Sequence, residues 1–367
     1  MSEPNPPVCA QDYADLAQRR LDPATWAWLE SGGADGLTLR ANREAYQHLK
    51  LRSRVLRPLK GAHTRLGLGG ESLEHPIFIA PTAWHGLLHP EGERATALAA
   101  AATHTPFIVS AQSGTSIQTL AALNPTLTLW FQLYAQTRPE DTLVLATRAV
   151  KAGARALVLT VDAPVNGVRN TEQRSGFQRP PHIRSVHLEG LSPAIARAGA
   201  PGGSPLFSTG LLEAAPTWDD VKRLRDALKG TPLWLKGILD PEDAQRAIEC
   251  GADGLMISNH GGRCLDTLPS SLEALPAVAD AVGGRVPLML DGGIRRGTDI
   301  LKALALGARA VAIGRPILHA LAAGGPPAAA HLIQILRGEL EVAMALTGCR
   351  ALDDVTDDVL WPSPHTQ

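Results

Sequence analysis

Eight short apolar runs, each followed by an amphipathic stretch, constrain the fold of this chain more than any other feature. The runs cover residues 76–80, 107–111, 129–134, 156–162, 232–237, 254–259, 286–293 and 310–315. Runs of this length that are rich in Val, Ile and Leu are typical of strands buried on both faces. The stretches between them, such as PEDAQRAIECGA and GTDILKALALGA, have helical periodicity and end near a glycine that can cap a helix.

This alternation predicts an α/β fold of the (β/α)8 TIM barrel type and leaves a doubly wound sheet as the alternative. Residues 1–70 precede the first strand, and their helical patterns should form an N-terminal helical cap region on the barrel floor. The barrel should cover 71–355, followed by a C-terminal tail at 356–367. Residues 163–216, after the fourth strand, form a long loop scattered with proline and glycine. Because this loop leaves a strand end where barrel active sites lie, we expect it to be a lid.

The composition argues against several classes of function. The 367-residue chain has a formal net charge of -1, so no strong field exists to attract nucleic acid or an anionic membrane. Its four cysteines lie far apart without a Cys-x-x-Cys pair, which disfavours a disulfide framework or a zinc site. The polar, proline-rich N-terminus is unlike a signal peptide, and no apolar run reaches the roughly 18 residues of a transmembrane helix. We therefore expect a cytoplasmic protein without a metal, membrane or nucleic-acid partner.

Polar or titratable side chains stand at the C-terminal end of every predicted strand. In a barrel these ends meet at one mouth, where active sites lie. In chain order they are Thr82, Ser110, Gln112, Gln132, Tyr134, Thr160, Asp162, Lys236, Ser258, His260, Arg263, Asp291, Arg295 and Arg315. A turn explains one polar residue at a strand end, but polar residues at all eight ends are unusual in a purely structural barrel. The set predicts an active site.

The last two strand ends have the features of a phosphate site. Barrels often hold phosphate in these two loops, at the N-terminus of a helix. The segments DGGIRRG and IGRP supply glycines, which let backbone N–H groups approach an anion, and the charges of Arg295 and Arg315. Two tight turns with surface arginines are the alternative. The sequence favours a phosphorylated ligand.

Three further residues suggest chemistry. Lys236, on the fifth predicted strand, suits either a Schiff base, as in barrel aldolases, or a fixed positive charge beside an anionic cofactor. A lysine that merely reaches solvent is the structural alternative. Asp162 and His260 can form a carboxylate–imidazole pair, in which the carboxylate sets the tautomer that a general base needs.

Seven segments together resemble the FMN-dependent 2-hydroxy acid oxidases and dehydrogenases, which include glycolate oxidase, lactate oxidase and mandelate dehydrogenase. The segments are APTAWHGLLHPEGE, FQLY, LTVDAP, LKGI, SNHGGRCLD, DGGIRRGTDILKALALGARAVAIGRP and MALTGCR. They follow the family's order and spacing from about residue 12 to 355. The resemblance implies an FMN cofactor, a small 2-hydroxy acid substrate, oxygen or another electron acceptor, and a homotetramer or octamer.

The resemblance also implies a role for each matching residue. His260 would be the base, Asp162 its partner, and Arg263 and Arg169 the clamp on the substrate carboxylate. Tyr134 would bind the reacting oxygen, and Lys236 would stabilise the reduced flavin as well as bind it. The residues implied to line the flavin are Pro81, Thr82, Ala83, Ser110, Gln132, Thr160 and Ser258. Those implied to bind the ribityl chain or the phosphate are Asp291, Gly292, Gly293, Arg295, Gly314 and Arg315.

The chain departs from the family pattern near the substrate. Trp28 stands where relatives have a Tyr that binds the substrate carboxylate, and Gln112 replaces a Trp of the pocket wall. Cys264 replaces a Gln, and an inert buried thiol is favoured over a reactive one. His85 has no counterpart, and a satisfied histidine is favoured over a second base. With Trp28 and Gln112 in the substrate site, the pocket should be altered.

The sequence thus predicts an FMN-dependent oxidase that converts an (S)-2-hydroxy acid bulkier than glycolate to the 2-oxo acid. The alternatives are a dehydrogenase or tailoring oxidase of the same family with a non-standard substrate, a flavin-binding protein without turnover, and a lysine-dependent barrel aldolase that uses Lys236.

Overall fold

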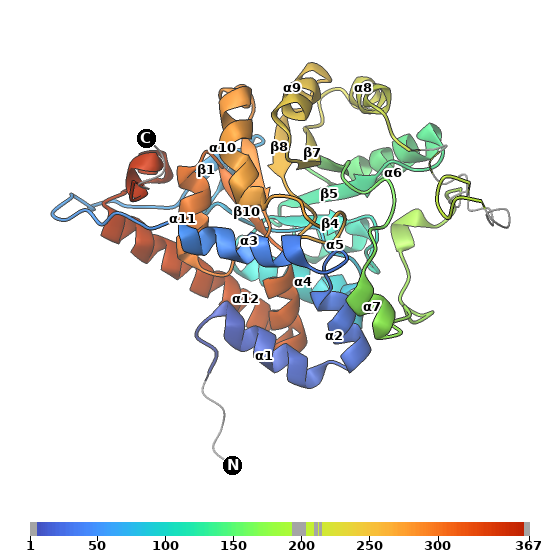
Figure 1. The fold of residues 1–367 in the computed structure, drawn as a ribbon, viewed down its shortest axis with the longest axis horizontal. Helices are drawn as coiled ribbons and strands as arrows, with labels where there is room; N and C mark the ends of the chain where they lie inside the picture. Colours follow the sequence, from blue (N-terminus) through green and yellow to red (C-terminus); the bar gives the residue numbers. More distant parts are fainter. Residues whose placement is uncertain (1–5, 193–202, 209–211, 213–214, 363–367) are drawn as a thin grey trace, which may run out of the picture.

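Eight parallel strands close into a barrel in the computed structural model, which describes residues 6–192, 203–208, 212 and 215–362 (Figure 1). The strands are β3 (Ile77–Ile79), β4 (Phe107–Ser110), β5 (Leu129–Tyr134), β6 (Leu157–Thr160), β7 (Leu233–Ile238), β8 (Gly254–Ile257), β9 (Leu288–Asp291) and β10 (Ala310–Ile313). Each coincides with one predicted run, and β10 pairs with β3 to close the circle. The closed barrel confirms the TIM-barrel prediction and excludes a doubly wound sheet.

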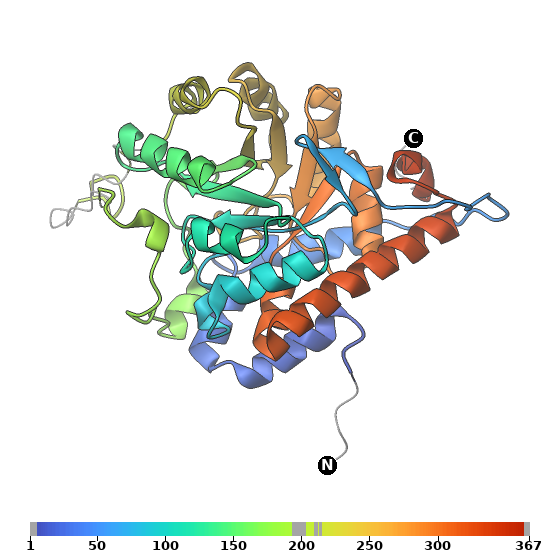
Figure 2. The same cartoon turned by 180° about the vertical axis from the view of Figure 1, so that it is seen from behind.

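Helices follow the strands and form the outer layer of the barrel. They are α4 (Gly92–Ala102), α5 (Ile117–Leu123), α6 (Pro139–Lys151), α8 (Trp218–Ala227), α9 (Pro241–Glu249), α10 (Ser271–Val282), α11 (Gly297–Ala305) and α12 (Arg315–Thr347). Helix α10 is an example of how local residues set the ends of a helix. Ser270 and Glu273 form a capping box at its start. Gly283, with φ of 57°, ends that helix in the left-handed conformation that glycine tolerates. Figure 2 shows α12 crossing the outer surface of the barrel.

Large aromatic side chains fill the barrel interior near its floor. The ring centroids of Trp130 and Trp234 lie 5.1 Å apart, and that of Phe78 lies 4.9 Å from Trp130. A hairpin of β1 (Leu66–Leu68) and β2 (Glu71–Leu73) turns at Gly69, where an added Cβ would lie 3.2 Å from Trp130. Since Trp130 lies near the beginning of β5, this hairpin closes the floor.

The prediction that the N-terminal helices cap the floor is wrong. Helices α1 (Ala10–Arg20), α2 (Pro23–Glu30) and α3 (Leu37–His48) lie together on one side of the barrel (Figure 1). Asp266, which follows β8, accepts the backbone N–H groups of Leu37 and Thr38 at the start of α3. These contacts place α3 at the mouth, because they join it to a loop that follows the C-terminal end of a strand.

Glycines in the mouth loops explain this position of α3. A Cβ on Gly293 would overlap the carbonyl oxygen of Asn42, and a Cβ on Gly262 would lie 2.7 Å from the backbone of Leu39. Both glycines have positive φ, so both the space and the backbone conformation require a residue without a side chain. The polar loops at the mouth therefore accept a helix that the sequence pattern alone placed at the floor.

The segment after β6 passes beside the N-terminal helices. It contains the short helix α7 (Asn170–Arg174), which packs against α2, and the 3-10 turn η2 (Val186–Leu188). Of the predicted lid at 163–216, residues 193–202, 209–211 and 213–214 lie outside the described residues. The remainder places α7 next to the mouth, because α2 is bound to the loop that follows β8.

The C-terminal residues return to the N-terminal region. The 3-10 turns η4 (Leu352–Asp354) and η5 (Asp357–Val359) lead to Leu360, which pairs with Leu51 in an antiparallel bridge. The tail predicted at 356–367 is thus attached to the body as far as residue 362, the last that the structure describes. Within the described ranges, no helix is both long enough and apolar enough to cross a membrane.

Candidate active site

Side chains from neighbouring strand ends form an incomplete polar ring inside the mouth. Gln132 at β5 accepts a hydrogen bond from Ser110 at β4 at 3.1 Å and donates to Thr160 at β6 at 2.9 Å. All three side chains are buried. Buried polar groups need hydrogen-bond partners, and these contacts supply them.

Lys236 at β7 joins the other half of the ring. Its amine donates to Ser258 at 2.8 Å and lies 3.3 Å from Asp291 Oδ2. Burial lowers the pKa of Lys236, but Asp291 and Asp162 outweigh burial and raise that pKa well above its ordinary value. The amine therefore stays protonated at neutral pH. A Schiff-base lysine needs a neutral amine, so this environment opposes the aldolase alternative.

Asp291 retains one unused acceptor. Its Oδ1 is buried without a hydrogen-bond partner among the described residues, while Oδ2 faces Lys236. A buried carboxylate oxygen without a partner is unfavourable. We therefore expect Oδ1 to accept a hydrogen bond from a group that is not part of the chain. The oxygen suits a hydroxyl of a bound molecule.

His260 lies between a carboxylate and a phenol. Its Nδ1 is 2.9 Å from Asp162 Oδ1, and its Nε2 is 3.3 Å from the Tyr134 hydroxyl. Burial raises the pKa of Asp162, but Lys236 and His260 outweigh it, so the pKa is lowered and the group is ionised. Burial raises the pKa of Tyr134 to about 12, which keeps its proton in place. Asp162 thus fixes the Nδ1–H tautomer and leaves Nε2 as the basic nitrogen.

The backbone that carries His260 is unusual. His260, Gly261 and Gly262 have φ values of 59°, 63° and 72°, so three successive residues are left-handed. This conformation costs on the order of 1–2 kcal/mol for a residue other than glycine. The Ser258 hydroxyl, which accepts the His260 N–H at 3.0 Å, helps to hold it. A strained residue at a strand end is typical of a functional site.

Two arginines bind the C-terminal end of α2. Arg263 Nη1 donates to the carbonyl oxygens of Trp28 at 2.9 Å and Ser31 at 3.0 Å. Arg315 donates from Nε to Leu29 O and from Nη2 to Ser31 O, and its Nη1 reaches the carbonyl of Gly261. Cations at a helix C-terminus meet its free carbonyls and the negative end of its dipole.

Each nitrogen of the Arg315 guanidinium thus donates to a carbonyl of the protein. Arg315 is also the first residue of α12 and follows the N-cap Gly314. N–H groups in the first turn of a helix have no intrahelical acceptor and can bind an anion. The structure thus separates the side chain of Arg315, which ties α2 to the mouth, from its N–H.

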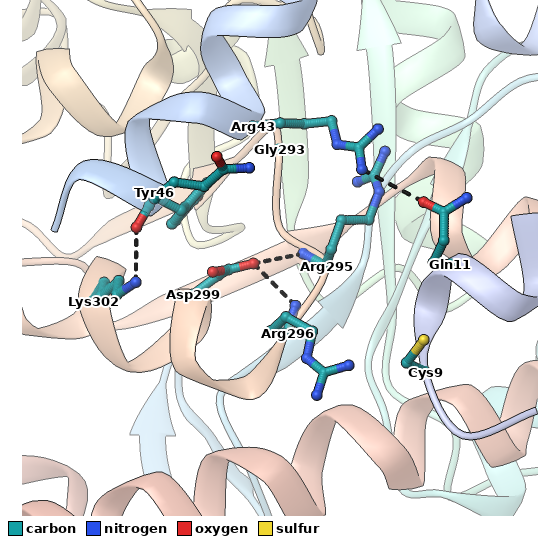
Figure 3. Close-up of a pocket in the computed structure, with 10 residues that line it drawn as sticks. Cys9, Gln11, Arg43, Tyr46, Gly293, Arg295, Arg296, Asp299 and Lys302 are labelled. Carbon is teal, nitrogen blue, oxygen red and sulfur yellow. Dashed lines mark hydrogen bonds between the residues drawn. The ribbon is translucent and has the colours of Figure 1, made fainter. Parts of the chain in front are cut away.

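Gly293 and Arg295, both predicted phosphate residues, line a cavity of about 360 Å³ beside the start of α11 (Figure 3). Arg43, Arg296 and Lys302 line it as well. The pKa of Arg295 is lowered to about 10, by burial first and then by the charges of Arg315 and Arg43, although Glu30 opposes this. The excess of positive charge makes this side of the loop favourable for an anion.

Comparison with known proteins identifies the family of the chain. The family model described as FMN-dependent dehydrogenase matches residues 17–362. The chain belongs to the FMN-dependent dehydrogenase family. It is 45% identical to an L-lactate oxidase of Roseobacter sp. strain GAI101, over 96% of this chain and 95% of that protein. It is 42% identical to the peroxisomal (S)-2-hydroxy-acid oxidase GLO4 of Oryza sativa subsp. japonica, over 96% of both chains.

A solved structure shares the fold closely. The crystal structure of mandelate oxidase with (S)-2-phenylpropionate superposes with a TM-score of 0.87 at 35% identity, covering 97% of this chain and 98% of the other. The predicted family, the FMN cofactor and the enzyme class, an oxidoreductase acting on the CH–OH group of 2-hydroxy acids, are confirmed. Membership of this family excludes the aldolase alternative.

The two departures from the family pattern lie in different surroundings. The Trp28 ring is buried between Trp84 and Phe177, with centroid distances of 5.8 and 5.6 Å. The guanidinium carbon of Arg263 lies 5.7 Å from the Trp28 ring centroid, which allows a cation–π contact. Gln112 follows β4, and its N–H donates to Ser110. Trp28 is thus part of an aromatic wall that contacts a predicted substrate arginine.

His85 is a buried histidine with every polar group bound. Its ring nitrogens lie 2.7 Å from the Thr82 hydroxyl and 2.8 Å from the Thr96 hydroxyl, and its N–H donates to Glu93. Burial lowers its pKa, which favours the neutral ring. This environment matches the satisfied histidine and places His85 behind Thr82, a predicted flavin residue.

Cys264 lies beside Asp162 and His260. Burial raises the pKa of its thiol to about 11, which matches the inert thiol. Its sulfur and ligand atoms of Asp162 and His260 lie within 4.8 Å of one another. The Asp162–His260 hydrogen bond already accounts for two of these groups, and the charge of Lys236 nearby disfavours a cation.

Sequence reasoning missed two acidic partners of the mouth arginines. Glu172 lies 2.7 Å from Arg169, and its spacing of three residues within a helical pattern was a readable signal. Glu30 accepts from His319 at 2.8 Å, and the 289 residues between them leave no signal in the sequence. The His319 ring is buried, and the same Glu30 oxygen lies 3.9 Å from Arg315 Nε.

We expect Arg315→Glu to yield protein with little bound FMN. The substitution removes two hydrogen bonds to the N-terminal region and one to Gly261 of the mouth, and it places a negative charge at the predicted phosphate loop. The ratio of flavin to protein absorbance after purification measures this. Arg309→Glu, at an exposed pair with Asp353, is the control and should stay yellow. A variant of Arg315 as yellow as the parent would contradict the phosphate assignment.

Proposed function

We propose that this protein oxidises an (S)-2-hydroxy acid to the 2-oxo acid with His260 as the base. The observation that supports this is the placement of His260, whose Nδ1 is held by the ionised Asp162 while Nε2 lies beside the Tyr134 hydroxyl. A base in this position can take a proton from the substrate, and the resulting imidazolium is stabilised by Asp162. FMN, when bound, supplies the two-electron acceptor.

The residues of the mouth fit FMN. Asp291 Oδ1 offers a free acceptor to a ribityl hydroxyl, and the protonated Lys236 suits the negative charge of a reduced flavin ring. Gly314 at the start of α12 and the positively lined loop after β9 suit the phosphate. We assign the flavin ring to the strand-end residues Pro81, Thr82, Ala83, Ser110, Gln132, Thr160 and Ser258, and the phosphate to Gly292, Gly293, Arg295, Gly314 and the N–H of Arg315.

We assign the substrate carboxylate to Arg169 and Arg263, and the reacting oxygen to Tyr134. Both guanidinium groups lie at Glu172, whose Oε2 is 2.7 Å from Arg169 Nη1 and 3.7 Å from Arg263 Nη2, and Arg169 Nε has no hydrogen-bond partner among the described residues. Planar guanidinium groups match a carboxylate in geometry and charge. The relatives named oxidases support oxygen as the electron acceptor.

His260→Gln should retain FMN but slow the reduction of the flavin by substrate about 100-fold or more, because a positioned base usually contributes that much. Stopped-flow absorbance under anaerobic conditions measures the rate. The flavin spectrum before mixing is the control for an intact site. Reduction at the parental rate would remove His260 from the mechanism.

The substrate should be bulkier than glycolate. Trp28 removes the phenol of the family's carboxylate site, and Gln112 replaces a large apolar wall with a shorter amide that opens space. L-lactate is the second candidate, since relatives at 42–45% identity are L-lactate oxidases. The solved mandelate oxidase, at 35% identity, is named for a larger aromatic substrate.

A substrate panel separates these candidates. We expect a low kcat/KM for glycolate and lactate and a higher value for a larger acid such as (S)-mandelate, measured by oxygen uptake. Trp28→Tyr with Gln112→Trp should move the preference toward small acids. This interpretation of the pocket would be wrong if glycolate were the best substrate of the parent, or if the double variant lost glycolate activity. Lactate as the best substrate would favour the second candidate.

We also propose that the protein forms a homo-oligomer, a tetramer by family resemblance. Residues 50–62 run beside the end of α12 (Figure 2), where the Arg54 N–H donates to Leu346 O. Leu56 is fully exposed, and Leu346 and Trp361 are 65% and 62% exposed. Exposed large apolar side chains on neighbouring segments suit an interface between subunits. Light scattering of Leu56→Asp with Leu346→Asp should report a smaller particle than the parent; an unchanged mass would place the interface elsewhere.

A further inference from the structure

The carboxylate of Glu172 lies among the arginines that we assign to the substrate. Its Oε2 is 2.7 Å from Arg169 Nη1 and 3.7 Å from Arg263 Nη2. The hydroxyl of Ser31, at the end of α2, lies 3.4 Å from the same oxygen. Glu172 belongs to α7, so one side chain of the segment after β6 links both guanidinium groups and the N-terminal helices.

Arg169 keeps an unused donor despite this contact. Glu172 takes Nη1, while Nε is buried with no hydrogen-bond partner among the described residues. A guanidinium can present Nε–H together with an Nη–H as a fork that matches a carboxylate. Because a buried unpaired donor is unfavourable, the free Nε indicates that this edge awaits an acceptor from outside the chain.

The guanidinium of Arg263 is also held in part by the protein. Its Nη1 is committed to the carbonyls of Trp28 and Ser31, and Nη2 is on the side of Glu172. Its guanidinium is therefore fixed in direction by α2 and by Glu172 together. Both arginines have part of the guanidinium held by the protein.

The positive charges of Arg169 and Arg263 are balanced in part by Glu172. Burial, Arg315 and Arg169 lower the pKa of Arg263 to about 9, and Glu172 acts in the opposite direction. The Glu172 side chain is 22% exposed, so water screens its attraction only in part. If Glu172 lost its negative charge, nothing in this contact would offset the repulsion between the two guanidinium groups. Both groups would then be held less firmly in position.

We propose that Glu172 is a positioning residue that orients Arg169 and Arg263 for the substrate carboxylate. This inference rests on the proposed function, which assigns the two arginines to that carboxylate. Glu172 acts through the arginines and takes no part in proton or electron transfer. Its effect is therefore on the binding of carboxylate ligands, and the chemical step should be nearly unchanged.

The test compares Glu172→Gln with Glu172→Asp in the FMN-loaded enzyme. Glu172→Gln should raise KM about tenfold or more, the effect expected when a hydrogen bond to a charged group is lost, with kcat within about threefold of the parent. Glu172→Asp, which keeps the charge, should restore part of the affinity. Glu189→Gln is the matched control: Glu189 also pairs with an arginine, Arg184, at 2.7 Å after β6, but it is 48% exposed. It should leave KM unchanged.

A second measurement separates positioning from general damage to the pocket. The Kd of the 2-oxo acid product, followed by the change in flavin absorbance, should rise in Glu172→Gln. The Kd of the uncharged amide of the same hydroxy acid should not rise, because it presents no carboxylate. An equal loss for both ligands would mean that Glu172 serves only the structure of the pocket, and would overturn the proposal.

The remaining outcomes are also decisive. An unchanged KM would show that the Arg169–Glu172 pair is incidental, and a lowered KM would show that Glu172 competes with the substrate; either result overturns the proposal. Arg169→Met and Arg263→Met are tested in parallel. If they raise KM and Glu172→Gln does not, only the role of Glu172 fails; if they leave KM unchanged, the assignment of the carboxylate to these arginines fails first.

Discussion

The site depends on the hydrogen bonds that hold the C-terminal end of α2 to the barrel mouth. Arg263, after β8, and Arg315, after β10, donate to the last carbonyls of this helix. These bonds satisfy carbonyls that would otherwise lack a partner, and they place two cations at the negative end of the helix dipole. They also fix the guanidinium of Arg263 beside the aromatic wall of Trp28. A structural tie and the proposed substrate-binding group are thus the same side chain.

The barrel could be predicted from the sequence because its strands are buried on both faces. Such a strand is apolar at every position, so the run itself marks the strand, and each of the eight runs contains one. The position of α1 to α3 could not be predicted. Helical periodicity shows that one face of a helix is buried, but it does not identify the surface that covers it. The contact of Thr38 with Asp266 spans 228 residues and depends on a loop whose path the sequence does not specify.

The candidate site divides in the same way. Asp162 and His260 could be paired from their places at two strand ends, since a barrel brings such ends together, and the structure places them 2.9 Å apart. The direction of the Arg315 side chain could not be predicted. The sequence shows a cation near a phosphate loop, but the carbonyls of Leu29 and Ser31 that bind it come from α2, which the sequence placed at the opposite end of the barrel.

The two glycines after His260 serve two constraints that meet at one loop. His260, the proposed base, needs a backbone that turns sharply at the end of β8, and the left-handed conformation of three successive residues provides that turn. The N-terminal region needs to approach the same loop, and the absence of a side chain at Gly262 makes room for Leu39 of α3. Either constraint alone would favour glycine there. Together they couple the orientation of the base to the packing of α3, so a side chain introduced at Gly262 would disturb both the mouth and the region that covers it.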